Sequence, residues 1–332
     1  QDFSGLHINL AYGLKEQRPP DEDPYLLDLM FDVDPKIQRK WVKGLTLVAI
    51  NAADEESAYL AFRSNQEKGS SGKRLRNNEL KQLLDLAVDF ALRAGEVHHR
   101  RATGDVGSKS TATDPVTQVD REAEALIAEA IKEARPDDSI LGEESTLIEG
   151  TSGFQWVIDP LDGTVNYLYN FPSYAVSIGI ETAGEPVVGV VLDTAINHLF
   201  AAQRGGMATK NGEEIQVTSC SELPLALLGT GFAYEPSVRE QQAKVAGSLL
   251  PKVRDIRRSG SCAVDLCSVA AGRLDAFYET GVNWWDVAAG IQIVRSAGGV
   301  ATYEPDLKRV FASGPKLWDQ LIHAVNQAEK GL

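Results

Sequence analysis

Apolar residues recur at three- and four-residue intervals in two stretches of the chain, and this spacing predicts two amphipathic helices. The first stripe starts at Leu80, and we expect Gly95 to end its helix. The second stripe runs over 120–133 and follows a loop at 103–113. The first stripe consists of Leu80, Leu83, Leu84, Ala87, Ala91 and Ala94.

The pattern then changes to short β-rich runs separated by glycine-containing turns, and after residue 217 it changes again to an alternation of strands and helices. This order predicts an α/β fold class, with an α+β half at 75–217 and an α/β half at 218–332. We expect strands at 155–158, 175–181, 187–193, 199–203, 226–229, 255–258 and 276–278, turns at 183–184 and 205–206, and helices at 238–250, 263–272 and 287–297.

Residues 1–74 differ from the rest and are predicted to be an N-terminal extension of unknown role. Apolar spacing at 25–30 and 41–62 favours at least two helices there. Gly69-Ser70-Ser71-Gly72 is typical of a flexible connector. The chain begins with Gln1 rather than Met and lacks a signal-peptide pattern, so we expect a fragment or a processed product.

Composition narrows the functional classes. The chain has 332 residues, enough for two domains, and a formal net charge of −14. Such a charge argues against direct binding of nucleic acid through its phosphates. No apolar run approaches the ~18 residues of a membrane span. The cysteines, of which there are 3, are too few for a disulfide framework or a zinc site, so a reducing cytoplasm is expected.

The most informative motif is Trp-Val-Ile-Asp-Pro-Leu-Asp-Gly-Thr-Val-Asn at 156–166. An apolar run ends in Asp159 and Asp162, with Pro160 fixing the backbone between them. Carboxylates are the hard oxygen ligands that magnesium prefers. Amides at a new helix start, from Gly163 onward, can receive phosphate oxygens. A turn with an Asp N-cap is the alternative interpretation of the same residues.

Two further acidic positions strengthen the metal interpretation. Glu143 and Glu144 follow an apolar stretch and a glycine, and Asp286 stands at the start of a helical segment after Trp284 and Trp285. Each is weak alone, because glutamate pairs are common in solvated loops and Asp is a common N-cap. Together with the 156–166 motif, they closely resemble the inositol monophosphatase family of magnesium-dependent, lithium-sensitive phosphomonoesterases. The resemblance covers residues 78 to 330.

The resemblance implies a layered α-β-α-β-α sandwich with the site between its two halves. It also implies that Mg²⁺ is held by Glu143, Asp159, Leu161, Asp162 and Asp286. The first ion would take Glu143, Asp159 and the Leu161 carbonyl, and the second would take Asp159, Asp162 and Asp286. A third, weaker ion would rest mainly on Glu143 and water.

For catalysis, the resemblance implies water activated at the metal centre as the nucleophile. Thr164, helped by Asp120, would orient it, with Glu143 as the third catalytic residue. The Gly163 and Thr164 amides would hold phosphate oxygens. The alternative role of Asp120 is that of a helix N-cap. Lys109 matches a family loop lysine near the metal site, and its alternative is a solvated lysine without a role in the site.

The substrate pocket is expected around Glu279, seven residues before Asp286, which matches the family glutamate that binds inositol hydroxyls. Gly260 and Ser261 match pocket-lining positions, although relatives often have Thr at the latter. Cys262 replaces a small Ala, which puts the fine shape of the pocket in doubt.

The histidine pair and the tryptophan pair are expected to have structural roles. We expect His98 and His99 to form a solvated helix terminus with no role in the site. Trp284 and Trp285 are expected to pack at the domain junction and position Asp286, with substrate stacking as the alternative.

The expected substrate is a small phosphomonoester, with inositol monophosphate or a similar polyol or sugar phosphate first. Histidinol phosphate or phosphoadenosine phosphate is the alternative within the enzyme class. A regulatory binding role in transcription is the alternative outside it. The expected partner is a second copy of the chain in a homodimer, with no membrane.

Overall fold

The computed structural model describes residues 55–100, 107–108, 115–116, 118–144 and 146–331, with side chains from residue 78 except in the short strands at 107–108 and 115–116. The chain divides into two compact units, Gln1–Arg76 and Asn77–Leu332. The helices expected at 25–30 and over most of 41–62 lie outside the described residues. The halves expected at 75–217 and 218–332 stay a prediction.

The connector expected at residues 69–72 is wrong, because those residues lie inside helix α5 (Glu55–Arg100). Glycine and serine disfavour a helix by less than about 1 kcal/mol each, and good helix formers flank them here. Gly95 does not end the helix either. A Cβ at Gly95 would lie 2.7 Å from Leu192 Cδ2, so the glycine lets α5 approach the sheet closely.

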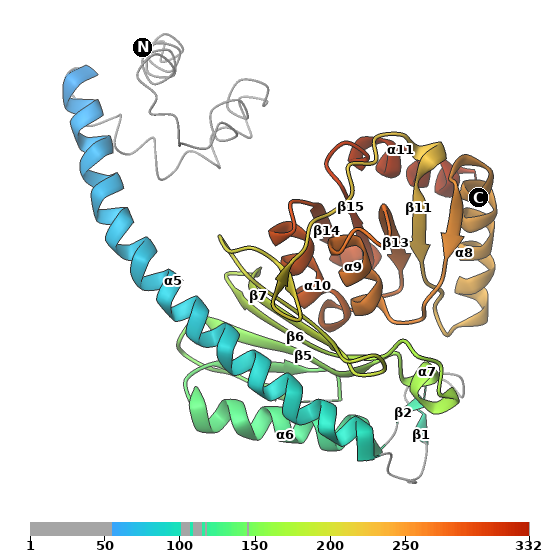
Figure 1. Ribbon diagram of the computed structural model, residues 1–332, viewed down its shortest axis with the longest axis horizontal. Helices are drawn as coiled ribbons and strands as arrows, with labels where there is room; N and C mark the ends of the chain where they lie inside the picture. The colour runs from blue at the N-terminus through green and yellow to red at the C-terminus, as the bar shows by residue number, and fades with distance from the viewer. Residues whose placement is uncertain (1–54, 101–106, 109–114, 117, 145, 332) are drawn as a thin grey trace. The chain divides into compact units, whose positions relative to one another are not determined.

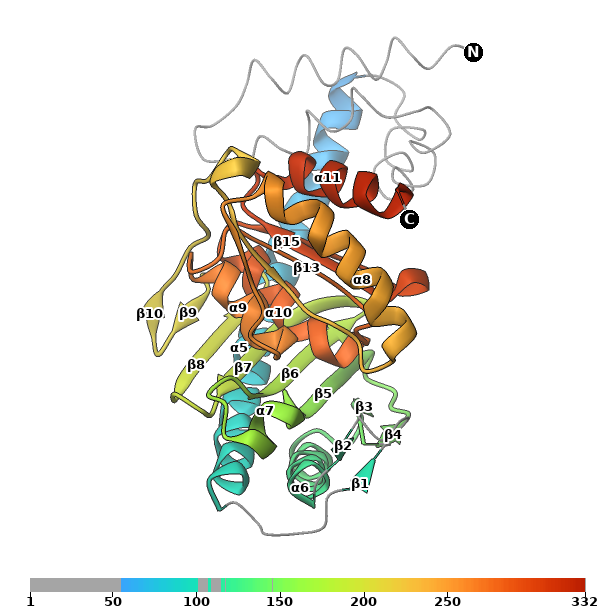
Figure 2. The same cartoon turned by 90° about the vertical axis from the view of Figure 1, so that its right-hand side faces the viewer.

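From Leu80 onward, helix α5 packs beside helix α6 (Gln118–Ala134) on one face of an eight-stranded sheet (Figures 1 and 2). Strand order is β10-β9-β8-β7-β6-β5-β3-β4, antiparallel throughout except for the parallel pair β3 and β5. The bounds are β3 Ser139–Gly142, β4 Leu147–Ile148, β5 Phe154–Asp162, β6 Ala175–Thr182, β7 Glu185–Asp193, β8 His198–Gln203, β9 Thr209–Lys210 and β10 Glu213–Glu214.

A second, five-stranded sheet has the order β12-β11-β13-β15-β14. Its first three strands are parallel, and β15 pairs antiparallel with both β13 and β14. Helices α8 and α11 cover its outer face (Figure 2). The bounds are β11 Leu227–Thr230, β12 Asp255–Arg257, β13 Ala276–Thr280, β14 Val300–Glu304, β15 Arg309–Ser313, α8 Pro236–Leu249 and α11 Trp318–Lys330.

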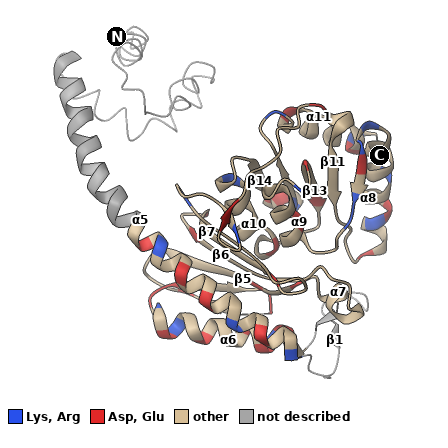
Figure 3. Cartoon of the chain, viewed as in Figure 1, with Lys and Arg blue, Asp and Glu red and all other residues tan. Residues whose placement is uncertain are grey.

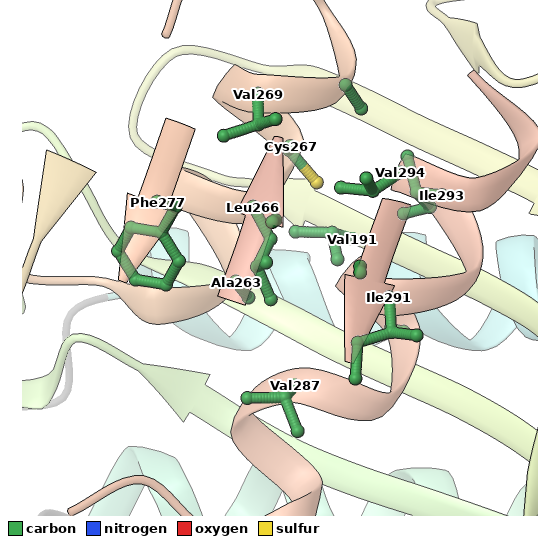
Figure 4. Packing of buried hydrophobic residues seen from close by; sticks show 14 of the residues in the cluster. Val191, Ala263, Leu266, Cys267, Val269, Phe277, Val287, Ile291, Ile293 and Val294 are labelled. Carbon is green, nitrogen blue, oxygen red and sulfur yellow. The ribbon is translucent and has the colours of Figure 1, made fainter. Parts of the chain in front are cut away.

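Helices α9 (Cys262–Ala270) and α10 (Trp284–Ser296) fill the space between the two sheets. Their side chains meet in one apolar cluster with Val191 of β7 and Phe277 of β13 (Figure 4). Charge gathers instead on outer helices such as α6 and α8 (Figure 3). The order helix, sheet, helix, sheet, helix confirms the layered α/β fold. Each sheet buries both faces, so its strands carry apolar runs rather than strict alternation.

Helix α10 lies directly on the backbone of the large sheet. A Cβ at Gly189 would lie 2.3 Å from the Ala289 carbonyl oxygen, and one at Gly179 would lie 2.9 Å from Ala288 Cβ. Only glycine in the strands and alanine in the helix permit this approach. The backbone of the helix that carries Asp286 therefore packs directly against the backbones of β6 and β7.

The strands and helices expected from 155 to 297 are present, with bounds shifted by up to a few residues. The last sheet hairpin, β14 and β15, and the final helix α11 were missed. Short connecting elements complete the chain: β1 Gly107–Ser108 pairs with β2 Pro115–Val116, helix α7 spans Thr164–Tyr169, and 3-10 turns lie at Leu223–Leu225, Leu250–Lys252 and Pro305–Leu307. Within the described residues, no helix has the length and apolar character to cross a membrane.

Candidate active site

Strand β5 carries Asp159 and Asp162 into the protein interior, where both side chains are buried. Its pairing with β6 is regular up to Asp159 opposite Ser177, and then shifts before Asp162 pairs with Ala175. Proline at position 160 explains this irregularity, because it has no N–H to give to a strand ladder. The Leu161 amide folds back and donates to Asp159 Oδ1 at 3.0 Å.

Asp162 is held by the start of helix α9. Its Oδ2 accepts a hydrogen bond from Ser261 Oγ at 2.6 Å and one from the Ala263 amide at 2.7 Å. Ser261 is the N-cap residue, and its Oγ also accepts from the Val264 amide at 3.2 Å. Burial raises the pKa of Asp162 to about 6, although these donors favour the charged form.

Asp286 lies in the first turn of α10 and joins a capping box with Asn283. Asp286 Oδ2 accepts from the Asn283 amide at 2.6 Å. Asn283, not Asp286, is therefore the N-cap. Trp284 donates from Nε1 to Glu181 Oε2 at 2.6 Å, which ties this helix start to β6. This hydrogen bond supports the expected positioning role of Trp284, which stays a prediction.

The loop that carries Glu143 is held by a glutamate that sequence reasoning missed. Glu124 of α6 is buried and accepts from the amides of Glu144 and Thr146, at 2.7 and 3.0 Å, and from the Thr146 hydroxyl at 2.7 Å. A Cβ at Gly142 would lie 2.5 Å from Glu124 Oε2, so the glycine makes room for this carboxylate. In the sequence, the only sign of this role is that Glu124 lies beside the apolar stripe of α6.

The expected metal ligands Glu143, Asp159, Asp162 and Asp286 act on one another electrostatically. Burial, followed by the charges of the other three, raises the pKa of Asp159 well above its usual range. Burial and the charges of Glu143 and Asp162 do the same for Asp286. Buried acids that repel one another require protons or cations. The fifth expected ligand, the Leu161 carbonyl, lies between Asp159 and Asp162 in the 156–166 motif.

These donors fit magnesium, because all are carboxylate or carbonyl oxygens. They do not yet form a closed metal cage: among the described residues, no three His, Cys, Asp or Glu side chains have that arrangement. Asp159 has side-chain hydrogen bonds with Glu143 and with Asp286, so these acids are neighbours in space. The ligand set therefore stays a prediction that the chemistry of the donors supports.

Thr164 and Asp120 are brought together from α7 and α6. Thr164 Oγ1 lies 3.0 Å from Asp120 Oδ1 and 3.0 Å from the Leu161 carbonyl oxygen. One hydroxyl hydrogen can serve only one of these acceptors at a time, so the lone pairs of Oγ1 remain available to another donor. Asp120 lies inside the first turn of α6, which begins at Gln118, and not at its N-cap.

Glu279 lies on β13, in the second sheet, close to the same acids. Burial and the charges of Asp265 and Asp162 raise its pKa well above the usual range, and Arg258 opposes them. A Cβ at Gly231 would lie 1.9 Å from Glu279 Oε1, so the carboxylate rests against a bare backbone.

Gly260 has a φ of 93°, which favours glycine, and borders the site. A Cβ there would lie 2.5 Å from Arg258 Nη1. Asn166, the last residue of the 156–166 motif, donates from Nδ2 to the carbonyls of Ser259 and Ser173, at 2.8 and 2.7 Å. The motif on the first sheet is thereby tied to the loop before α9.

The prediction for His98 is wrong. Its side chain is 1% exposed and contacts the Pro160 carbonyl oxygen and Thr194 Oγ1, both at 2.9 Å. Only His99 is exposed, as expected. The signal was present, because His98 follows Ala94 by four residues and so continues the apolar stripe. The mistaken helix end at Gly95 hid it.

Lys109 lies outside the described residues. Cys262 is buried at the start of α9, where burial and the charges of Glu279 and Asp162 raise the pKa of its thiol well above the usual range. A neutral, buried thiol fits a packing role at this position.

Known proteins of similar sequence and fold identify the family of this chain. The profile of the inositol monophosphatase family matches residues 79–328. Inositol-1-monophosphatase SuhB of Mycobacterium tuberculosis is 41% identical over 277 residues, which cover 76% of this chain and 96% of that protein. The chain belongs to the inositol monophosphatase family. As a member of this family, it is a phosphomonoesterase.

Other relatives of this family member add detail. Nus factor SuhB of Xylella fastidiosa is 46% identical over 208 residues, which cover 62% of this chain and 74% of that protein. The crystal structure of extragenic suppressor protein suhB from Bartonella henselae has a TM-score of 0.70 and 34% identity, with 74% of this chain and 98% of that chain covered.

Proposed function

We propose that the chain hydrolyses inositol monophosphate, or a similar polyol or sugar phosphate, with magnesium as the cofactor. The observation that carries this proposal is the gathering of acids: burial, followed by the charges of Glu143, Asp162 and Asp286, raises the pKa of Asp159 well above its usual range. Hard oxygen donors of this kind suit magnesium. The name of the Mycobacterium tuberculosis relative supports inositol phosphate as the substrate class.

Bound at Glu143, Asp159, Asp162, Asp286 and the Leu161 carbonyl, magnesium would supply the positive charge that phosphate hydrolysis requires. The protein's own task is to hold those oxygens in place. Backbone amides do this for three of them: Leu161 N for Asp159, Ala263 N for Asp162 and Asn283 N for Asp286.

Thr164 orients the attacking water in this proposal. Its hydroxyl donates to Asp120 or to the Leu161 carbonyl, which directs a lone pair of Oγ1 to a water hydrogen. Buried Asp120 fixes the rotation of the hydroxyl. The amides of Gly163 and Thr164 receive phosphate oxygens, as the family resemblance implies.

Substrate hydroxyls are proposed to bind Glu279, with Gly260 lining the pocket. Ser261 has a different main role from the one expected, because its hydroxyl already donates to Asp162 Oδ2 at 2.6 Å. We assign it to holding a metal ligand. Lithium sensitivity, a cytoplasmic location and a homodimeric state remain parts of this proposal, to be tested by inhibition, fractionation and light scattering.

A second function has one observation in its favour, the 46% identity to a protein named Nus factor SuhB. In this alternative, the chain also binds transcription proteins. Binding of purified RNA polymerase and its elongation factors by wild-type protein, measured at physiological salt, would test it.

A phosphate-release screen tests the enzymatic proposal. Inositol 1-phosphate, histidinol phosphate, phosphoadenosine phosphate and fructose 1,6-bisphosphate are compared with and without magnesium. We expect the highest kcat/KM for inositol 1-phosphate and no turnover after chelation. Higher kcat/KM for either of the next two substrates would contradict the polyol assignment, and turnover without a divalent ion would contradict the metal assignment.

A further inference from the structure

His98 is buried near the end of helix α5 and has partners at both ring nitrogens. Nε2 lies 2.9 Å from the carbonyl oxygen of Pro160, and Nδ1 lies 2.9 Å from Thr194 Oγ1. The ring also packs against Tyr167 and Tyr174, with centroids 6.0 and 6.3 Å away. The aromatic cage and two hydrogen bonds leave the ring a single orientation.

Its partners fix the tautomer. A carbonyl oxygen only accepts, so Nε2 must carry a hydrogen and donate it to Pro160. Burial, the largest influence, lowers the pKa of His98 to about 4, so the ring is neutral at physiological pH. Nδ1 therefore accepts, and Thr194 donates its hydroxyl hydrogen to it.

The Pro160 carbonyl belongs to the same peptide unit as the Leu161 amide. That amide donates to Asp159 Oδ1 at 3.0 Å. The peptide plane is rigid, so a bond that fixes its carbonyl also fixes its N–H. Donation to the carbonyl also polarises the amide and strengthens the bond that the amide donates. The chain of contacts runs from His98 through one peptide to the carboxylate of Asp159.

We propose that His98 is a positioning residue for the metal centre, which holds Asp159 Oδ1 on the Leu161 amide and leaves Oδ2 for the ions. The Leu161 carbonyl belongs to the next peptide unit, so the contact acts on Asp159 and not directly on that carbonyl. This inference rests on the proposed function, because the ions are those of the phosphatase centre.

The location of the contact favours this role over simple packing. Pro160 lies at the point where β5 and β6 lose their register, so its carbonyl is outside the regular strand pairing. A buried carbonyl without a donor costs about 1–3 kcal/mol and lets its peptide turn toward another partner. The imidazole supplies that donor from another element, α5.

The test compares variants that remove donation to Pro160 with one that restores it. His98→Leu and His98→Asn remove the donor, the second because its side chain is too short to reach. His98→Gln restores an N–H near the Nε2 position. Trp156→Phe is the matched control: it removes a buried donor on the same strand, the Nε1 bond to Asp138 Oδ2 at 2.9 Å, away from the peptide concerned.

Magnesium affinity is measured by titration calorimetry on the full chain, beside melting temperature, KM and kcat. We expect about 10- to 100-fold weaker magnesium binding in His98→Leu and His98→Asn, as for other residues that orient metal ligands. We expect His98→Gln to recover most of the affinity. Trp156→Phe is expected to lose stability while keeping wild-type affinity.

Two contrary outcomes are distinguishable. Active wild-type protein, with His98→Leu and His98→Asn that bind magnesium as the wild type does, would overturn the positioning role alone. Wild-type protein that neither binds magnesium nor releases phosphate would overturn the proposed function and the positioning role with it. If His98→Leu does not fold, the contrast between His98→Asn and His98→Gln decides by the same criterion.

Discussion

The two sheets hold their functional acids in different ways. On the large sheet, Asp159 and Asp162 each accept a backbone amide, at 3.0 and 2.7 Å, and Asp162 also accepts a serine hydroxyl. On the small sheet, Glu279 lies against the bare backbone of Gly231, with Arg258 as the charge that opposes its neutralisation. The first arrangement fixes oxygen positions by hydrogen bonds, and the second packs a carboxylate against a backbone without a side chain.

In the proposed function, this difference corresponds to a division between residues for catalysis and residues for substrate recognition. Ion ligands must be correct to fractions of an ångström, so hydrogen bonds hold them from several elements. A group that meets hydroxyls on different polyols benefits from space and needs less fixation. We expect substitutions on the large sheet to act on kcat and metal affinity, and substitutions around Glu279 to act on KM and substrate choice.

The largest effect on catalysis is expected from substitution of Asp159, the acid that the other expected metal ligands surround. Asp159→Asn removes a charge that two ions would share, so we expect kcat to fall by at least about a thousandfold, or about 4 kcal/mol of barrier. Steady-state kinetics at saturating magnesium, with circular dichroism for the fold, provide the check. Near-normal turnover in a folded variant would contradict the metal assignment.

The recognition side should respond differently. Glu279→Gln removes a charged acceptor for substrate hydroxyls, so KM for inositol 1-phosphate should rise by about 10- to 100-fold while kcat changes little. The control substrate is p-nitrophenyl phosphate, which has no polyol. Equal losses on both substrates would place Glu279 in the chemistry and erase the distinction between the sheets.

Lithium inhibition tests the second ion site. Lithium resembles magnesium in size but carries one charge, so it would compete for the proposed site of Asp159, Asp162 and Asp286 while phosphate is still bound. We expect uncompetitive inhibition at millimolar lithium, and a severalfold higher requirement in Asp286→Asn. Titrations at several substrate concentrations test this, and indifference of the wild type to tens of millimolar lithium would refute it.

We expect acid to reduce the folding stability that buried, neutral His98 contributes. Its folded pKa of about 4 is below the ordinary value of 6.5, so the unfolded chain binds the proton first as pH falls. The stability is complete above pH 6.5 and is lost as pH falls toward 4, by about 2 kcal/mol at pH 5. Urea unfolding of the wild type and of His98→Gln at pH 7 and pH 5 measures how much of the acid-induced loss of stability comes from His98. Equal losses in the free energy of unfolding of both proteins would contradict this prediction.

The smallest effect is expected outside both sheets. Deletion of residues 1–74 removes most of the first compact unit, Gln1–Arg76, and stays clear of the family match at 79–328. We expect unchanged kcat and KM and a folded protein. Insoluble or inactive truncated protein would show that the extension stabilises the phosphatase.

Sequence alone could locate the acids of the large sheet because signals there are local. Asp159 and Asp162 are neighbours at the end of an apolar run, with proline and glycine beside them. Glu124 and His98 were missed because each acts through a loop distant in sequence, and its value depends on which backbone group lies opposite. Such pairings arise from tertiary packing, which periodicity does not encode.

The end of the chain was missed for a different reason. Strands β14 and β15 have only 5 residues each, and a 3-10 turn at Pro305–Leu307 joins them. Runs of this length carry little periodic signal. Their position in the sheet follows from the parallel strands already in place, which leave an edge for β15 to pair with.

The glycines under helix α10 work as a gauge for ion size. Gly179 and Gly189 let helix α10 lie directly on the sheet, and we expect this height to influence how far Asp286 lies from Asp159. Magnesium needs oxygens at about 2.0–2.1 Å, whereas calcium accepts about 2.3–2.6 Å and looser geometry. A single methyl group at either glycine would lift the helix and widen the span between these carboxylates. In the proposed metal centre, such a widening would favour the larger calcium ion over magnesium.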